Sequence, residues 1–143
     1  MPRRLLLLHA AATLFMTGVI WFVQAVHYPL FAELGAALPY YATRNARLTT
    51  WVVAGPMLFE LGTGLVLAAR PPRGTTPWLA WTALAALALI WVTTALVQLP
   101  RHERLQAGDL QAVGELVASN WVRTAAWSLR TGLVLRMLDA SRA

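Results

Sequence analysis

The chain has 143 residues, of which 58% are hydrophobic and 13% are charged. Soluble domains carry about 25% charged residues, so a surface exposed to water on all sides is excluded. The length suits a single domain over residues 1–143, with no separate catalytic module. Cysteine is absent and every basic side chain is arginine, which excludes disulfides, thiolate chemistry and lysine Schiff bases.

The net charge of +6 raises the question of a nucleic-acid partner. The arginines, however, fall in separated pairs beside apolar runs, where arginine anchors helix ends at lipid headgroups. These pairs are Arg3 and Arg4, Arg44 and Arg47, Arg70 and Arg73, and Arg101 and Arg104. Because no basic stripe interleaved with aromatic residues is present, we expect a lipid bilayer and no nucleic acid as partner.

Four apolar runs predict an all-α, four-transmembrane-helix bundle. The expected spans cover residues 5–26, 48–69, 76–98 and 120–138. The first run resembles a signal peptide, but it is too long for one and lacks a cleavage site, so we interpret it as a retained helix. The last run is the weakest, because Arg123, Arg130 and Arg136 lie on it.

The two longer connections predict that helices 2 and 4 extend beyond the bilayer on the outer side. Pro39 suits the first turn of a helix that begins near Tyr40, and Asp109 can cap one that begins at Leu110. Arginines are more frequent near the termini and the 70–73 turn than at the other end. This bias predicts that both termini lie on the cytoplasmic side. We expect the membrane to be a bacterial inner membrane.

Pro56 lies inside the second run and is expected to kink that helix. A faint internal duplication is also visible, since the first run ends in HYP (27–29) and the third in QLP (98–100). Prolines end helices in any case, so the match also has a coincidental explanation.

Glu60 and Arg130 lie deep in the second and fourth runs. Counted from the outer helix ends, both lie about 15–17 Å deep. Ionisable side chains cost roughly 2.5–3.5 kcal/mol in hydrocarbon and usually face a partner inside the bundle. We therefore predict a buried Glu60–Arg130 ion pair, which either fixes helix register or supplies a catalytic or ligand-binding carboxylate.

Polar residues of all four helices occur near the outer ends, where a bundle can direct them into one cavity with Glu60 as its floor. The predicted ligand-binding residues are Gln24, Arg47, Thr94, Gln98, Asn120, Arg123 and Trp127. Alternatively, these groups cap helix ends and bond to headgroups.

His27 is the histidine of this group and titrates near neutral pH, so it is the candidate catalytic base, with Glu60 as second catalytic residue. His9 lies about 27 Å away along the same helix and is not expected to join it, whereas His102 could approach through the outer connection. One histidine and one glutamate fall short of a three-ligand zinc site, so no metal site is predicted and the cofactor is unknown. A histidine bonded to a backbone carbonyl or headgroup is the alternative.

Four motifs carry a family resemblance: WFVQAVHYPLF (21–31), EL (60–61), QLP with a following leucine (98–105), and NWVR (120–123). In this order they resemble the anthrone-oxygenase-like group of small four-helix bacterial membrane proteins. The resemblance implies a site for a hydrophobic aromatic or quinone-like molecule, with cofactor-independent oxygenation of an anthrone to a quinone.

The resemblance also implies roles for individual residues. His27 would be the base, Glu60 its electrostatic partner or the proton acceptor, and Arg47 or Arg123 the group that stabilises a phenolate. Relatives often carry histidines just after the first connection, where this chain has Ala42 and Asn45, which cannot serve as base or ligand.

The alternative function is a non-catalytic accessory or structural subunit of a larger membrane complex, in which Glu60 and Arg130 are scaffold. A homo-oligomer is a further partner that the sequence leaves open. A transporter or channel is disfavoured, because four helices enclose little lumen.

Overall fold

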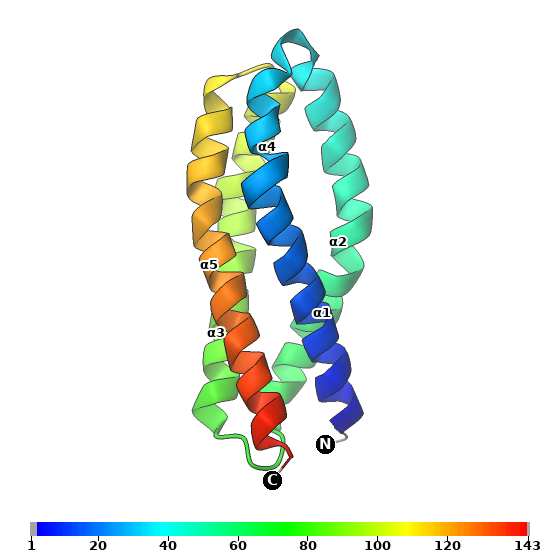
Figure 1. Ribbon diagram of the computed structural model, residues 1–143, viewed down its shortest axis with the longest axis vertical. Helices are drawn as coiled ribbons and strands as arrows, with labels where there is room; N and C mark the ends of the chain where they lie inside the picture. Colours follow the sequence, from blue (N-terminus) through cyan, green and yellow to red (C-terminus); the bar gives the residue numbers. More distant parts are fainter. Residues whose placement is uncertain (1–2, 143) are drawn as a thin grey trace.

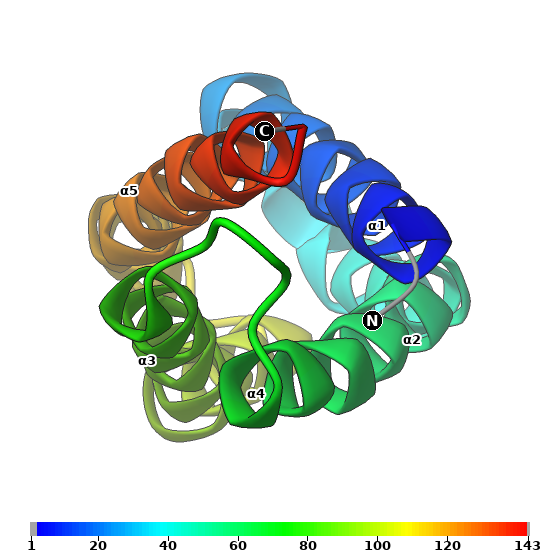
Figure 2. The same ribbon diagram turned by 90° about the horizontal axis from the view of Figure 1, so that it is seen from below.

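The computed structural model describes residues 3–142, and its regular elements are all helical. In chain order they are α1 (Arg3–Phe22), η1 (Val23–His27), η2 (Pro29–Glu33), η3 (Gly35–Ala37), α2 (Leu38–Ala69), α3 (Pro77–Thr93), η4 (Thr94–Gln98), α4 (Leu99–Gln106) and α5 (Gln111–Ala140). Since η1 continues α1, and η4 and α4 continue α3, the chain forms four long rods around one axis (Figure 1, Figure 2). The predicted all-α four-helix bundle is confirmed.

Both ends of the chain and the 70–76 connection lie at one end of the bundle, here called the lower end (Figure 1). The connections over residues 28–37 and 107–110 lie at the opposite, upper end. The side of the membrane that each end faces stays a prediction.

Three helical stretches among the described residues are long and apolar enough to cross a membrane: Arg3–Glu33, Gly35–Ala69 and Pro77–Gln106. Their large apolar side chains face outward, as Trp51 (81% exposed) and Phe22 (59% exposed) illustrate. Such an exposed apolar belt indicates an integral membrane protein. α5 has 30 residues and is long enough to cross, but it is not among these three, so the fourth span stays a prediction.

The upper starts of α2 and α5 follow the expected local chemistry. α2 begins at Leu38 with Pro39 in its first turn, where the missing N–H costs nothing. α5 begins at Gln111, whose backbone N–H donates to Asp109 Oδ1 over 2.9 Å. With 32 residues, α2 is about 48 Å long and exceeds a hydrocarbon core of about 30 Å.

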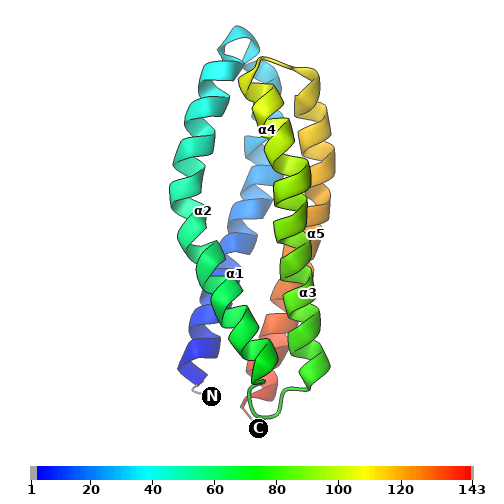
Figure 3. The same cartoon turned by 180° about the vertical axis from the view of Figure 1, so that it is seen from behind.

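Pro56 lies inside α2 without ending it. Figure 3 shows that α2 changes direction between its upper and lower halves. A proline removes one backbone hydrogen bond and displaces the preceding turn, which accounts for such a bend.

The interior alternates between apolar and polar layers, which is clearest along α1 and its continuation. Leu6 belongs to a lower apolar layer, Met16 and Ile20 to a middle one, and Phe31 to an upper one. Between them lie two polar groups, the lower cluster (His9, Thr13, Glu60, Thr63 and Arg130) and the upper cluster (Gln24, His27, Tyr28, Gln98, His102, Asn120 and Arg123). The middle apolar layer, with Met57, Leu87, Ile90 and Trp127, separates the two clusters.

Candidate functional site: a cavity in the upper half of the bundle

η1 and η4 shape the upper site. Each is a five-residue π-helical turn, one ending at His27 and the other at Gln98. Each is followed, after one residue, by a proline (Pro29 and Pro100). The HYP and QLP motifs therefore share a local backbone, and π turns of this kind are frequent at functional sites.

A cavity of about 330 Å³ lies between these two turns, α2, α4 and α5. Its floor is apolar, with Val53 and Met57 from α2. Its polar lining includes His27, Tyr28, Asn45, Gln98, His102 and Arg123. The volume is at the lower end of the range for small-molecule sites, and an apolar wall with a few polar groups is typical of them.

Tyr28 and His102 form one pair in this lining. The Tyr28 hydroxyl lies 3.0 Å from His102 Nε2, and Tyr28 is only 5% exposed. The opposite ring nitrogen, His102 Nδ1, is buried and has no hydrogen-bond partner among the described residues. The second ring nitrogen is therefore free to hydrogen-bond to a molecule in the cavity, as donor or acceptor according to the tautomer.

Arg123 is held from behind by a chain of amides. Its Nη1 donates to Asn120 Oδ1 over 3.0 Å, and Asn120 Nδ2 donates to Gln24 Oε1 over 2.9 Å. Gln24 Nε2 in turn donates to the carbonyl of Val117 over 3.2 Å. Gln24 and Asn120 therefore orient the guanidinium, and they do not line the cavity themselves.

Arg123 has no carboxylate within 4.0 Å in residues 3–142, where the ion pairs involve Arg101, Arg104 and Arg130. Four buried polar atoms of the lining have no hydrogen-bond partner among the described residues. They are His27 Nε2, Gln98 Oε1, His102 Nδ1 and Arg123 Nε. A buried polar atom without a partner costs about 1–3 kcal/mol, so the cavity favours an occupant that supplies partners.

The sequence-predicted residues divide between several places. His27, Thr94, Gln98 and Arg123 line the cavity; Gln24 and Asn120 lie behind it; Arg47 lines a separate surface pocket; Trp127 is buried in the middle apolar layer; Glu60 and Arg130 belong to the lower cluster.

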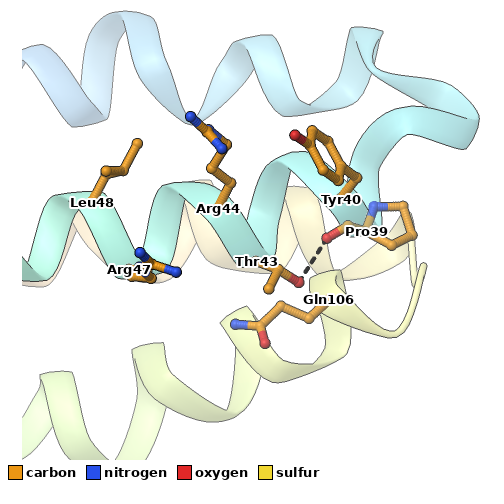
Figure 4. A pocket seen from close by; sticks show the side chains of 7 residues that line it. All are labelled: Pro39, Tyr40, Thr43, Arg44, Arg47, Leu48 and Gln106. Atoms are coloured by element: carbon orange, nitrogen blue, oxygen red, sulfur yellow. Dashed lines mark hydrogen bonds between the residues drawn. The ribbon is translucent and has the colours of Figure 1, made fainter.

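Arg47 does not reach the cavity because of the helical period. Asn45, Thr49 and Val53 follow one another at intervals of four on the inward face of α2. Arg47 is two residues from Asn45, which places it on the opposite side of the helix. Figure 4 shows Arg47 among the residues that line the surface pocket, on the same helix as Thr43.

Glu60 is not the floor of the cavity, contrary to the expectation. It lies about one turn below Met57, on the far side of the middle apolar layer. Trp127 is fully buried in that layer between the two clusters and does not line the cavity.

The lower cluster brings Glu60 and Arg130 together. Arg130 Nη2 lies 3.6 Å from Glu60 Oε1, both side chains are fully buried, and Arg130 Nη1 donates to the Ala83 carbonyl over 2.6 Å. The Thr13 hydroxyl donates to the same Glu60 oxygen. α1, α2, α3 and α5 therefore all meet at one level through a charged pair.

His9 is the member of the lower cluster that the sequence reasoning missed. Its Nε2 lies 2.8 Å from Arg130 Nη2, and its Nδ1 lies 2.6 Å from Thr63 Oγ1. A guanidinium only donates, so Nε2 accepts, and Nδ1 carries the hydrogen that it donates to Thr63. The i, i+4 spacing of His9 and Thr13 on one helix face was the available signal.

Tyr28 was not assigned to the site, and His102 was expected only as a residue that could approach it through the outer connection. Tyr28 stands beside His27 in the HYP motif, and His102 follows Gln98 by one helical turn on the same rod. Within residues 3–142, no three His, Asp or Glu side chains are grouped as metal ligands would be.

At the upper rim, Arg104 holds two carboxylates. Its guanidinium lies 2.7 Å from Asp109 Oδ2 and 2.6 Å from Glu115 Oε2. Hydrogen bonds from Arg104 lower the pKa of both carboxyl groups below their ordinary values. All three side chains are partly exposed to solvent, so the cluster joins α4 to α5 at the surface.

Fold and site together define a class: an all-α four-helix bundle with membrane-length apolar helices and a polar cavity near one end. Comparisons with family models, with curated proteins and with solved structures find no match to this chain.

Proposed function

We propose that this integral membrane protein binds a hydrophobic, weakly acidic aromatic molecule, such as a phenol or a quinone-like ring, in the upper cavity. The observation that supports it most is the Arg123 guanidinium, which has no carboxylate partner in residues 3–142 and lies beside an apolar floor and unsatisfied histidine and amide atoms. A planar ring with an ionisable hydroxyl complements both features, because burial strengthens a charge-assisted hydrogen bond.

Each lining group has a chemical part in this proposal. Arg123 binds the oxygen of the ionised ring, and Gln98 Oε1 accepts a hydrogen bond from a ring hydroxyl. The ring packs on Val53 and Met57. His102 or His27 takes the proton that the ligand gives up, and Tyr28 holds the His102 ring in place.

The resemblance to anthrone-oxygenase-like proteins extends the proposal to a reaction. A histidine of the cavity removes a proton from the methylene carbon of an anthrone, and Arg123 stabilises the resulting anion. The anion then reacts with molecular oxygen, which supplies the new carbonyl oxygen, and one molecule of water leaves. We place this activity in a bacterial inner membrane, with both chain ends cytoplasmic.

A binding experiment tests the proposal directly. The protein in lipid nanodiscs would be titrated with 1,8-dihydroxyanthraquinone, and binding followed by tryptophan quenching. We expect saturable binding that weakens tenfold or more in Arg123→Gln, since hydrogen bonds to charged groups are worth about 1.5–3 kcal/mol.

Arg136→Gln is the matched control, because Arg136 lies on the same helix outside the cavity. Equal affinity in wild type and Arg123→Gln, or no binding at all, would overturn the proposed site. Conversion of anthrone to anthraquinone, with His27→Ala and His102→Ala as variants, separates binding from catalysis.

The accessory-subunit function has its own supporting observation. An outward groove between α3 and α5 is lined by small side chains, among them Ala85, Ala86, Ala125 and Ala126. Small residues allow close approach of another membrane helix. Native mass spectrometry of the purified protein distinguishes the candidates, because an accessory subunit would carry partner chains, or further copies, and no aromatic molecule.

A further inference from the structure

A second pocket lies on the outside of the bundle, between the upper part of α2 and the end of α4 (Figure 4). It has a volume of about 490 Å³. Its lining includes Tyr40, Thr43, Arg44, Arg47, Leu48 and Gln106. In Figure 4, Arg47, Thr43 and Gln106 lie along the gap between the two helices.

The two arginines of this pocket differ from their neighbours at the same end. Arg101 and Arg104 are both paired with acidic side chains, whereas Arg44 and Arg47 have no carboxylate within 4.0 Å in the described part of the chain. Both are exposed, and they lie three residues apart on one helix. Figure 4 shows their side chains extending from different edges of α2, so the two like charges are kept apart, and a bound anion would draw both guanidinium groups toward the pocket that they line.

The position along α2 indicates what kind of anion fits. Arg44 and Arg47 lie in the first third of a helix that exceeds the hydrocarbon thickness, and so at the level of lipid headgroups. Directly below them, Leu48 is 52% exposed and Trp51 81% exposed. A positive pocket above an exposed apolar strip matches a molecule with an anionic head and an apolar tail.

We propose that Arg44 and Arg47 form a binding site for the phosphate of an anionic phospholipid, whose acyl chains lie along Leu48 and Trp51. Arginine suits this role because its planar guanidinium binds phosphate oxygens through two hydrogen bonds. The Gln106 amide supplies a further donor at the pocket edge. A zwitterionic lipid is disfavoured, since its ammonium group adds positive charge beside two guanidinium groups.

This site is separate from the function proposed above. Gln106 lines both the surface pocket and the inner cavity, so the bound lipid would lie against the outer wall of that cavity. No residue proposed to contact the aromatic ligand is needed for the lipid, and either proposal can fail alone.

The experiment is native mass spectrometry of protein released from nanodiscs that contain equal amounts of phosphatidylglycerol and phosphatidylcholine. We expect wild type to retain phosphatidylglycerol preferentially. Each basic residue near an anionic surface contributes about 1 kcal/mol, so Arg44→Gln and Arg47→Gln should each reduce that preference about fivefold, and the double variant about thirtyfold.

Arg101→Gln is the matched control. It also removes one positive charge at the upper end of the bundle, but that charge belongs to an arginine that is already paired with Glu115. Unchanged lipid preference in the double variant would overturn the proposal. Displacement of the lipid by millimolar inorganic phosphate would also overturn it, by assigning the site to a free anion. The thermal unfolding of each variant is measured as a stability control. If the double variant is unstable, the lipid preference of the two single variants decides the test, because both arginines are exposed and each can be replaced without disturbing the core.

Discussion

Arg130 donates a hydrogen bond to His9 across the bundle, from Nη2 to Nε2 over 2.8 Å, although 121 positions separate the two residues. The contact makes His9 a neutral acceptor and commits its other nitrogen to Thr63. The predicted Glu60–Arg130 pair is therefore part of a larger network that includes the first helix.

The first prediction concerns His9. His9→Leu leaves Arg130 Nη2 and the Thr63 hydroxyl without their imidazole partner, and a lost buried hydrogen bond of this kind costs about 1–3 kcal/mol. We expect a lower free energy of unfolding, measured by circular dichroism during denaturant titration in detergent. Thr82→Val on the exposed side of α3 is the control, and equal losses in both variants would contradict the network.

The second prediction concerns the charge balance of the lower cluster. Glu60→Leu leaves a buried guanidinium unpaired, which we expect to cost about 3–5 kcal/mol. The double change Glu60→Leu with Arg130→Met removes both charges and should be less destabilising than Glu60→Leu alone. Additive losses in the same unfolding assay would show that the two residues act independently; Glu33→Gln, on an exposed carboxylate, is the control.

The third prediction concerns Tyr28 and the proposed ligand. Tyr28→Phe keeps the ring in the upper apolar layer but removes the hydroxyl from His102 Nε2. We expect little change in the affinity for 1,8-dihydroxyanthraquinone, because Arg123 remains, and a clear loss of any anthrone turnover, because His102 is no longer oriented. The opposite pattern, weak binding with full turnover, would refute the positioning role of Tyr28.

The fourth prediction is a pH dependence at the upper rim. Because Arg104 lowers the pKa of Asp109 and Glu115 in the folded state, their contribution to stability is present above the ordinary carboxyl values of 3.8 and 4.5. It is lost as the pH falls through the lower, folded-state values. Both groups are exposed, so the effect is small.

Thermal unfolding between pH 6 and about pH 3 checks this dependence. Arg104→Gln should flatten the acid side of the wild-type curve, whereas Arg73→Gln, at the opposite end of the bundle, should leave it unchanged. Identical curves for wild type and Arg104→Gln would exclude the linkage.

The helix layout could be predicted from the sequence because each part of it has a local cause. Apolar runs set the rods, Pro39 and Asp109 set the starts of two of them, and Pro56 lies inside the helix expected to bend. Matched depth along two rods was enough to propose that Glu60 and Arg130 pair, since depth depends only on counting residues.

The site was less predictable, because it also depends on the rotation of each helix about its own axis. Arg47 is at the depth of the cavity but on the wrong face of α2. The distance to His27 along their shared helix excluded His9 from the upper site. The hydrogen-bond partners of His9, which are Thr63 and Arg130, lie at its own depth on other helices. Rotation is set by packing between helices, which one sequence does not specify.

The two π turns have one more consequence. A π turn contains one residue more than a regular α-helical turn. The residues that follow it are therefore rotated by about 100° about the helix axis, compared with an unbroken helix. Deleting one residue from η1 would rotate Tyr28 away from His102, and deleting one from η4 would rotate His102 away from Tyr28. The helices below the deletion would keep their packing. The side chains that line the upper cavity therefore depend on a pair of single-residue insertions, and the gain or loss of either one is a short mutational route between a bundle with the Tyr28–His102 contact and one without it.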